Sequence, residues 1–245
     1  MDQNGGANWL DQFRSKADLA IFLHNHQLND SAEEAISSAL EEAAWANNPE
    51  MVTLLLAHGA KITPFTLVGA CRSKNVTIFQ RFQQYGWDVN TVQFGGTVLR
   101  LLASDHTCMR WLLENGADPN FVDQDNATPL ETAAVSGSVA ELELLISYGA
   151  KVDALPRDIL PRVMRRDTHA VSVLRFLLNQ GLDVNADTLN DSVLHNAVRT
   201  GKVECVRILL EYGADCNVRT LEGLTPLAEA RECGYVEIEG LLASL

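Results

Sequence analysis

The sequence predicts an all-α fold: a solenoid of stacked helix–turn–helix units, joined by short β-hairpin finger loops, with a concave groove. Two observations predict it. A glycine recurs at positions 59, 86, 116, 149, 181 and 213, separated by 27, 30, 33, 32 and 32 residues. Each glycine follows apolar residues at helical spacing, such as Leu142, Leu145 and Ile146. Repeats of about this length stack in one dimension, each unit burying its apolar face against the next.

Each repeat contains the signals of two helices. The recurring glycine ends the second helix, because without a Cβ it adopts the left-handed backbone that closes a helix. The first helix opens at Thr128-Pro129-Leu130 in the best-preserved unit, where proline takes the first helical position without losing a needed hydrogen bond. Gly137 then turns the chain into the second helix.

These segments resemble ankyrin repeats. Thr128-Pro129-Leu130 stands where that family has its TPLH signature, Val193-Leu194-His195 takes the same place in residues 187–219, and Thr225-Pro226-Leu227 opens the last unit. The resemblance covers nearly the whole chain. It implies that the finger loops and first helices carry the recognition residues, and that His195 forms hydrogen bonds that tie adjacent loops together.

The resemblance also implies the organisation of the chain, which we expect to be one domain over 1–245. Residues 1–30 are expected to form N-terminal capping helices, 31–219 the repeats, and 220–245 a C-terminal capping repeat. The repeats are degenerate at 60–90, where the loop before Thr63-Pro64 is too short for a full finger, and at 151–185, where the TPLH motif is missing.

Composition excludes several classes of function. The net charge of −13 opposes binding to nucleic acid or to an anionic membrane surface. No run of about 18 apolar residues and no leader pattern occurs, so we expect a soluble, monomeric, cytoplasmic or otherwise intracellular protein, a nuclear location included. The five cysteines lack metal-site spacing, and His24 and His26 lack a third ligand, so no metal and no cofactor is expected.

Arginines near the ends of the first helices are the strongest binding candidates in so acidic a chain. Guanidinium groups bind carboxylates and phosphates through paired N–H donors, and aromatic and arginine side chains dominate many interfaces. We therefore expect a protein partner, acidic in part, held on the concave face by Trp45, Arg72, Phe94, Arg165, Arg166 and Arg199.

Structural explanations compete with this hypothesis. Arginines 157, 162 and 166 are near Asp153, Asp158, Asp167 and Asp187 in sequence, and could form rim ion pairs of little energetic consequence. Trp45 could pack against the N-terminal cap, beside Trp9 or Phe22.

An alternative function is a small-molecule ligand in a pocket of the irregular N-terminal and middle repeats. Its lining would be Trp45, Arg72, Phe94, Arg100, Asp105 and His106, with Asp105-His106 as an acid–base pair for a cofactor-free rearrangement. No common catalytic motif occurs, which favours binding over catalysis. Self-association or a passive scaffold is the third alternative.

Overall fold

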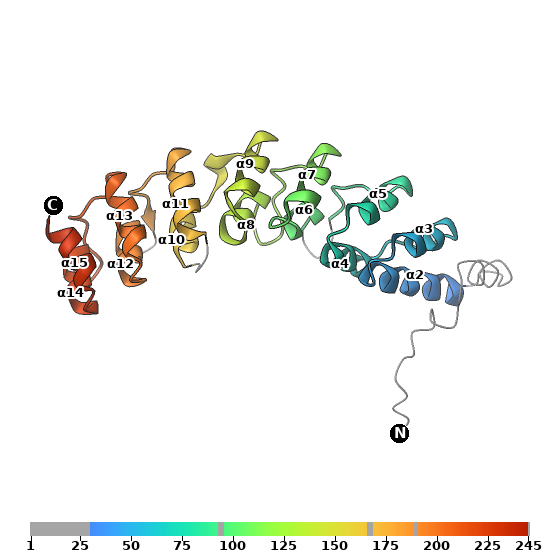
Figure 1. Ribbon diagram of the computed structural model, residues 1–245, viewed down its shortest axis with the longest axis horizontal. Helices are drawn as coiled ribbons and strands as arrows, with labels where there is room; N and C mark the ends of the chain where they lie inside the picture. Colours follow the sequence, from blue (N-terminus) through green and yellow to red (C-terminus); the bar gives the residue numbers. More distant parts are fainter. Residues whose placement is uncertain (1–29, 93–95, 166–168, 189–190, 245) are drawn as a thin grey trace, which may run out of the picture. The chain divides into compact units, whose positions relative to one another are not determined.

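The computed structural model describes residues 30–92, 96–165, 169–188 and 191–244, and these ranges are mainly helical (Figure 1). Packing divides them into two compact units. Unit 1 contains the described residues up to Leu102 together with Arg110–Ala117. Unit 2 contains Ala103–Met109 and the described residues from Asp118 onward. One uninterrupted domain over 1–245 stays a prediction.

In unit 1, helices of the same kind lie side by side. The first helices of successive repeats are α2 (Asp30–Trp45), α4 (Pro64–Ser73) and α6 (Val98–Leu101), and α4 contacts both of the others. The second helices α3 (Pro49–Ala57) and α5 (Val76–Gln84) contact each other. Helix α7 (His106–Glu114) contributes residues to both units.

Unit 2 repeats the same plan. Its first helices form one row: α8 (Pro129–Ser136), α10 (Ile159–Met164), α12 (Val193–Arg199) and α14 (Pro226–Cys233). Its second helices form another: α9 (Val139–Ser147), α11 (Ala170–Asn179), α13 (Val203–Glu211) and α15 (Val236–Ala243). The two rows can be followed along Figure 1. The predicted stacked helix–turn–helix fold is confirmed within the unit.

The helix ends follow from the residues identified in the sequence. A threonine or serine caps several first helices by accepting a backbone N–H with its hydroxyl, at Thr63, Thr128, Ser192 and Thr225. The six recurring glycines all have φ between 84° and 92°. Since a residue with a Cβ is strained there, these glycines end the second helices as predicted.

The finger loops differ between repeats. A short hairpin is formed by β1 (Asp187–Thr188) and β2 (Asp191–Ser192), which pair antiparallel. In the degenerate repeat at 151–185, the 3₁₀ turn η2 (Val152–Ala154) precedes the six-residue helix α10. The predicted N-terminal cap at 1–30 lies outside the described residues except for Asp30.

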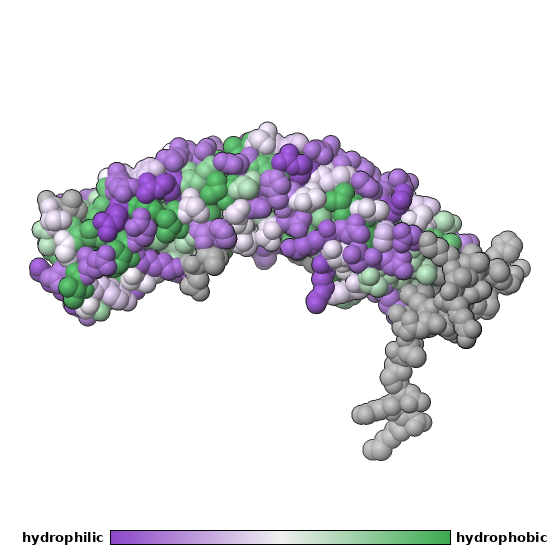
Figure 2. Space-filling view, viewed as in Figure 1, coloured by the Kyte–Doolittle hydropathy of each residue, from purple (hydrophilic) through white to green (hydrophobic). Residues whose placement is uncertain are grey.

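The core is continuous within each unit and is formed by the facing sides of the helices. In unit 1, Phe79 and Phe82 are fully buried, and Phe79 also contacts the rings of Trp87 and Trp111, with centroid distances of 5.9 and 6.3 Å. On the face shown in Figure 2, hydrophilic side chains predominate and apolar residues reach the surface in patches between them. These phenylalanines therefore belong to the core of unit 1.

An asparagine amide links neighbouring repeats. Its N–H₂ group donates to the carbonyl oxygen of the glycine that caps the next repeat. The pairs are Asn90 with Gly116, Asn120 with Gly149 and Asn185 with Gly213, at 2.9, 2.8 and 3.1 Å. The amide oxygens of Asn120 and Asn185 also accept backbone N–H groups of the following repeat. One side chain thereby satisfies two backbone groups across each of these junctions.

Candidate functional site

A tryptophan and an arginine meet on the surface of unit 1. Trp45 is the last residue of α2 and is 44% exposed, and the guanidinium carbon of Arg72 lies 5.3 Å from the centroid of its ring. This is cation–π distance. Two of the predicted binding residues, one repeat apart, are therefore in direct contact.

Gly69 explains how the indole reaches this position. A Cβ on Gly69 would lie 2.7 Å from the indole Cδ1 of Trp45 and 3.0 Å from both its backbone nitrogen and its Nε1. The missing side chain lets α2 and α4 approach closely and leaves room for the indole against α4. Sequence analysis missed this residue, although a glycine inside a predicted helix is a signal for close packing.

Arg72 has its charge available for a partner. It lies in the last turn of α4, where a cation is favoured by the helix dipole. Within the described ranges, no carboxylate forms an ion pair with it, and the contact recorded for its guanidinium is the Trp45 ring. The alternative that Trp45 packs against Trp9 or Phe22 involves residues outside those ranges, as does the third aromatic candidate, Phe94.

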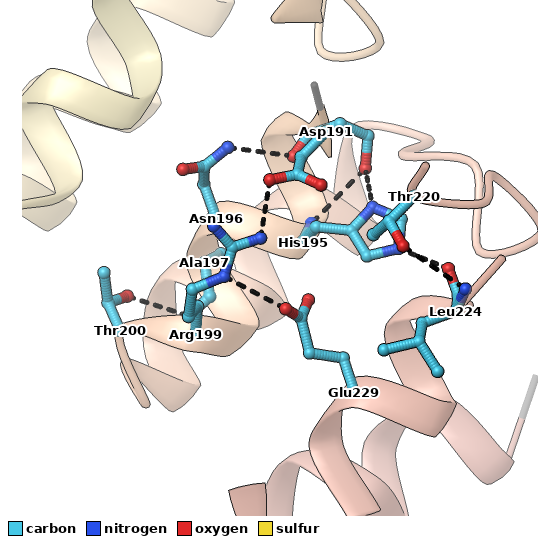
Figure 3. Close-up of polar contacts among 10 residues, drawn as sticks. Asp191, His195, Asn196, Ala197, Arg199, Thr200, Thr220, Leu224 and Glu229 are labelled. Atoms are coloured by element: carbon cyan, nitrogen blue, oxygen red, sulfur yellow. Dashed lines mark hydrogen bonds and ion pairs between the residues drawn. The ribbon is translucent and has the colours of Figure 1, made fainter. Parts of the chain in front are cut away.

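Arg199 is engaged differently. Its Nη2 donates to the Asp191 carboxylate at 2.6 Å and its Nε to Glu229 Oε1 at 3.0 Å, as Figure 3 shows. The hydrogen bond to Asp191 is the main cause of the raised pKa of this guanidinium; burial acts against it, and the bond to Glu229 adds to the rise. Both edges of Arg199 are thus bound within the chain, across the junction between two repeats.

Of the arginines between residues 157 and 166, one is ion-paired and two are exposed. Arg162 forms an ion pair with Glu131 of the preceding repeat, so it pairs as the structural explanation expected but with a different partner. Arg165 follows α10 directly and is exposed, and no ion pair joins it to another described residue. Arg157 is exposed at the edge of a 500 Å³ cavity. Arg166 lies outside the described residues.

His195 has the predicted tying role. Its ring is fully buried, its Nδ1 lies 2.9 Å from the Ser192 hydroxyl oxygen, and its Nε2 lies 3.1 Å from the carbonyl oxygen of Leu224 in the next repeat (Figure 3). A buried imidazole with both nitrogens used by the framework is a structural group rather than a catalytic one.

Asp105 and His106, the acid–base pair of the alternative function, each contact a residue near the start of a helix. The Asp105 carboxylate accepts the backbone N–H of Cys108 at 2.9 Å, so it caps α7. His106 Nδ1 lies 4.0 Å from Glu141. Burial acts to raise the pKa of Glu141, but hydrogen bonds from the Ser138 hydroxyl and N–H outweigh it, with His106 assisting, and the net pKa is lowered. Asp105 and His106 belong to unit 2, whereas Trp45, Arg72 and Arg100 belong to unit 1.

The described part of the chain was compared with what a metal site and a membrane-spanning helix require. There, no group of three or more histidine, cysteine, aspartate or glutamate side chains is placed to hold a metal ion. None of the described helices combines the length and the apolar character needed to cross a bilayer. His24 and His26 lie outside these residues.

Comparison with known proteins agrees with the fold. A family model described as ankyrin repeats (3 copies) matches residues 67–155, and one described as ankyrin repeats (many copies) matches residues 169–230. The crystal structure of the ankyrin repeat domain of Bcl-3 superimposes with a TM-score of 0.64 at 24% identity, covering 82% of this chain and 96% of that one. At this identity, the match shows the fold alone.

Curated relatives share parts of the sequence. Ankyrin repeat protein nuc-2 of Neurospora crassa is 33% identical over 138 residues, 55% of this chain and 13% of that protein. Putative ankyrin repeat protein FPV031 of fowlpox virus is 34% identical over 149 residues, 56% of this chain and 43% of that protein. Mouse protein phosphatase 1 regulatory subunit 27 is 39% identical over 93 residues, which are 37% of this chain and 59% of that protein. The chain spans less than two thirds of the length of each.

Proposed function

Because this chain belongs to the ankyrin-repeat family, whose repeats are protein–protein interaction modules, we propose that it binds a segment of a partner protein on its first helices and finger loops. In ankyrin proteins this is the concave face. Helix packing uses the opposite sides of these helices, so the residues of this face are free to vary with the partner.

The observation that carries the proposal is Arg72 over the Trp45 ring. An exposed aromatic ring packed closely against Gly69 loses little conformational entropy on binding, and a guanidinium placed over it presents N–H donors to the partner. Rigid aromatic and arginine side chains of this kind commonly dominate the binding energy of an interface.

The chemistry of the pair defines the partner segment. Arg72 offers a charge not matched by a described carboxylate, in a chain of net charge −13. A partner carboxylate would gain a charge-assisted hydrogen bond there, and an apolar partner side chain would cover the indole. The partner segment is therefore acidic in part, with an apolar residue beside the acidic one.

Arg165 extends the proposal to unit 2 as a further contact for acidic residues. Arg166 and Phe94 lie outside the described residues and stay candidates from the sequence alone. Arg199 has a positioning role, because both edges of its guanidinium are already bound to Asp191 and Glu229. It links two repeats through Glu229, which lies on α14 of the next repeat.

A selection from a random peptide library on the full chain tests the proposal. Selected peptides are expected to share an acidic residue next to an apolar one, and to bind the Arg72→Met or Trp45→Ala variant about tenfold or more weakly. Arg207→Met is the matched control, since Arg207 lies on the second helix α13 and pairs with Glu204. Circular dichroism checks that each variant is folded.

Affinity should also fall with added salt, because one exposed charge pair is screened. Peptides that bind the Arg72→Met and Trp45→Ala variants as tightly as the wild type would contradict this site. A library that enriches basic peptides only would contradict the proposed chemistry.

A further inference from the structure

One junction in unit 2 is not bridged by an asparagine. At the bridged junctions, an asparagine four positions after one capping glycine bonds to the next capping glycine, as Asn120 does to Gly149. Asp153 holds this position after Gly149, and the next capping glycine is Gly181. Within the described ranges, no hydrogen bond joins the Asp153 side chain to Gly181 or to Asp183.

Two backbone groups of the turn after α11 are therefore available. They are the carbonyl of Gly181 and the N–H of Asp183, and neither forms a hydrogen bond with another described residue. In the equivalent turn after α13, the Asn185 amide binds both groups, the Gly213 carbonyl at 3.1 Å and the Asp215 N–H at 2.8 Å. One carboxamide thus uses, in that turn, the same two groups that are unused in this one.

The two turns have the same conformation, so the comparison between them holds. Gly181 has φ of 90° and Gly213 has φ of 84°. The carboxylates of Asp183 and Asp215 each accept the N–H of the asparagine two positions later, at 2.9 and 2.8 Å. The acceptor and the donor of the turn after α11 are therefore placed as a carboxamide requires.

A cavity of about 500 Å³ lies at this junction. Gly181, Asp183 and Asp153 line it, and all three are exposed residues that a ligand in the cavity can reach. Apolar side chains from both sides of the junction also line it: Leu155, Pro156, Ile159, Leu160 and Leu182. A cavity of this size, with a few polar groups among apolar ones, suits an amino-acid side chain and the backbone beside it.

The polar groups of the cavity favour a carboxamide over a charged ligand. A carboxamide oxygen accepts the Asp183 N–H, and its two N–H donors suit the Gly181 carbonyl and the Asp153 carboxylate. A carboxylate ligand would be repelled by Asp153, and an ammonium ligand would leave the Asp183 N–H without an acceptor. Arg157 lines the same cavity and offsets the charge of Asp153, which weakens the attraction of a cation.

We propose that this cavity binds the carboxamide of an asparagine or glutamine side chain from a partner protein. The ligand would take the place that an asparagine of the chain itself occupies at the bridged junctions. The proposal rests on the proposed function in one respect, that the chain binds a partner segment. Its residues belong to unit 2 and the Trp45–Arg72 pair to unit 1, so each site has its own variants and either can fail alone.

The test is a nuclear magnetic resonance titration of the full chain with Nα-acetyl-glutamine N-methylamide and, separately, with the asparagine analogue. At least one of them should give saturable shifts at Gly181, Leu182 and Asp183, with a Kd on the order of 1 mM for so small a probe. The amide proton of Asp183 should move downfield as it gains an acceptor. Asp215 is the internal control, because Asn185 already binds its N–H, and it should not shift.

Matched compounds test the preference for a carboxamide. The glutamate, methionine and lysine analogues keep the two backbone amides of the probe and change only its side chain. Each should bind about tenfold or more weakly than the better carboxamide compound, because none of them offers both an acceptor and a neutral donor.

Two aspartate variants locate the site. Asp153→Asn supplies a carboxamide from the chain itself, so it should compete with the probe and weaken its binding about tenfold or more. The matched control is Asp158→Asn, which makes the same change of charge at an exposed residue outside the cavity lining. It should bind as the wild type does. The amide spectrum of each variant shows that it is folded.

Three results would overturn the proposal. Shifts that rise linearly with both carboxamide compounds, or that are as large at Asp215 as at Asp183, would show no site. Binding of the glutamate, methionine or lysine analogue as tight as that of the carboxamides would remove the preference. Wild-type binding in Asp153→Asn, or an equal loss in Asp158→Asn, would show that the unbridged junction is not where the probe binds.

Discussion

The Nε2 atom of His195 lies 3.1 Å from the carbonyl oxygen of Leu224, a residue of the next repeat. For this nitrogen to donate, the proton of the neutral imidazole must be on Nε2, so Nδ1 accepts from the Ser192 hydroxyl. The ring thus carries one directed chain of hydrogen bonds, from Ser192 at the start of α12 to the finger loop before α14.

Replacing His195 with alanine should lower the free energy of unfolding by about 2–4 kcal/mol, since it leaves a cavity and removes a donor to a partly buried carbonyl. The midpoint of urea unfolding measures this effect. His58→Ala, at a less buried histidine, is the control and should change the midpoint little. Equal midpoints for His195→Ala and the wild type would show that the hydrogen bonds of His195 contribute nothing to the stability of the chain.

Gly69→Ala should destabilise the chain by about 1–3 kcal/mol, because the new Cβ would lie 2.7 Å from the Trp45 indole. In the Trp45→Ala background the penalty should shrink, since the side-chain part of the clash is gone. The control is Gly240→Ala on α15, where a Cβ meets no atom within 4 Å. Thermal unfolding of the wild type, the two single variants and the double variant gives the coupling energy between positions 45 and 69. A Gly69→Ala penalty that is the same with and without the Trp45 side chain would contradict the predicted contact.

Arg199→Met should lower stability by about 1–2 kcal/mol, because it leaves Glu229 buried without its partner. The double variant Arg199→Met/Glu229→Gln should recover part of this loss. Arg175→Met is the matched control: its pair with Glu211 has both side chains more than 40% exposed, so its loss should change stability much less than Arg199→Met does. Similar losses at both arginines would argue against the burial effect.

Glu141 should make stability depend on pH in the acid range. Its pKa is lowered in the folded state, where burial is outweighed by the hydrogen bonds of Ser138. Its contribution is therefore complete above the unfolded pKa of about 4.3 and is lost as the pH falls through the lower, folded pKa. Urea unfolding between about pH 6 and pH 3 measures the loss.

Glu141→Gln isolates that contribution. Glutamine can keep the capping box with Ser138 but carries no charge. The variant should lose less stability than the wild type over the same acid range, with His106, 4.0 Å away, present in both proteins. Parallel curves for the two proteins would show that the pH dependence comes from other carboxylates.

The sequence predicted the parts of the fold that recur. The six capping glycines and the proline-led first helices follow from local chemistry repeated at a fixed spacing, and His195 was predicted correctly through its place in the repeat. Helix starts in the degenerate repeat were harder. His169, with φ of 59°, is the left-handed residue that precedes α11, and the sequence did not indicate it because apolar spacing does not encode the length of an irregular loop.

The candidate site was predicted less completely. Trp45 and Arg72 were both predicted as binding residues, and the structure brings the two side chains into contact. The partners of Arg162 and Arg199 were not, since Glu131 and Glu229 are about one repeat distant in sequence and charges nearer along the chain drew attention first. Gly69 was missed because only the fold shows what a Cβ there would strike.

Asp153 occupies the place that Asn120 and Asn185 take in their own repeats, and this gives unit 2 a weak joint. A carboxylate has no N–H to donate, so Asp153 cannot form the bond that Asn120 makes to the next capping glycine. The 500 Å³ cavity lined by Asp153, Gly181 and Leu182 lies at this same boundary. Heat or mechanical tension should separate the repeats here first. Asp153→Asn should slow amide hydrogen exchange at Asp183, which corresponds to Lys151 and Asp215, the residues whose N–H groups the equivalent asparagines accept.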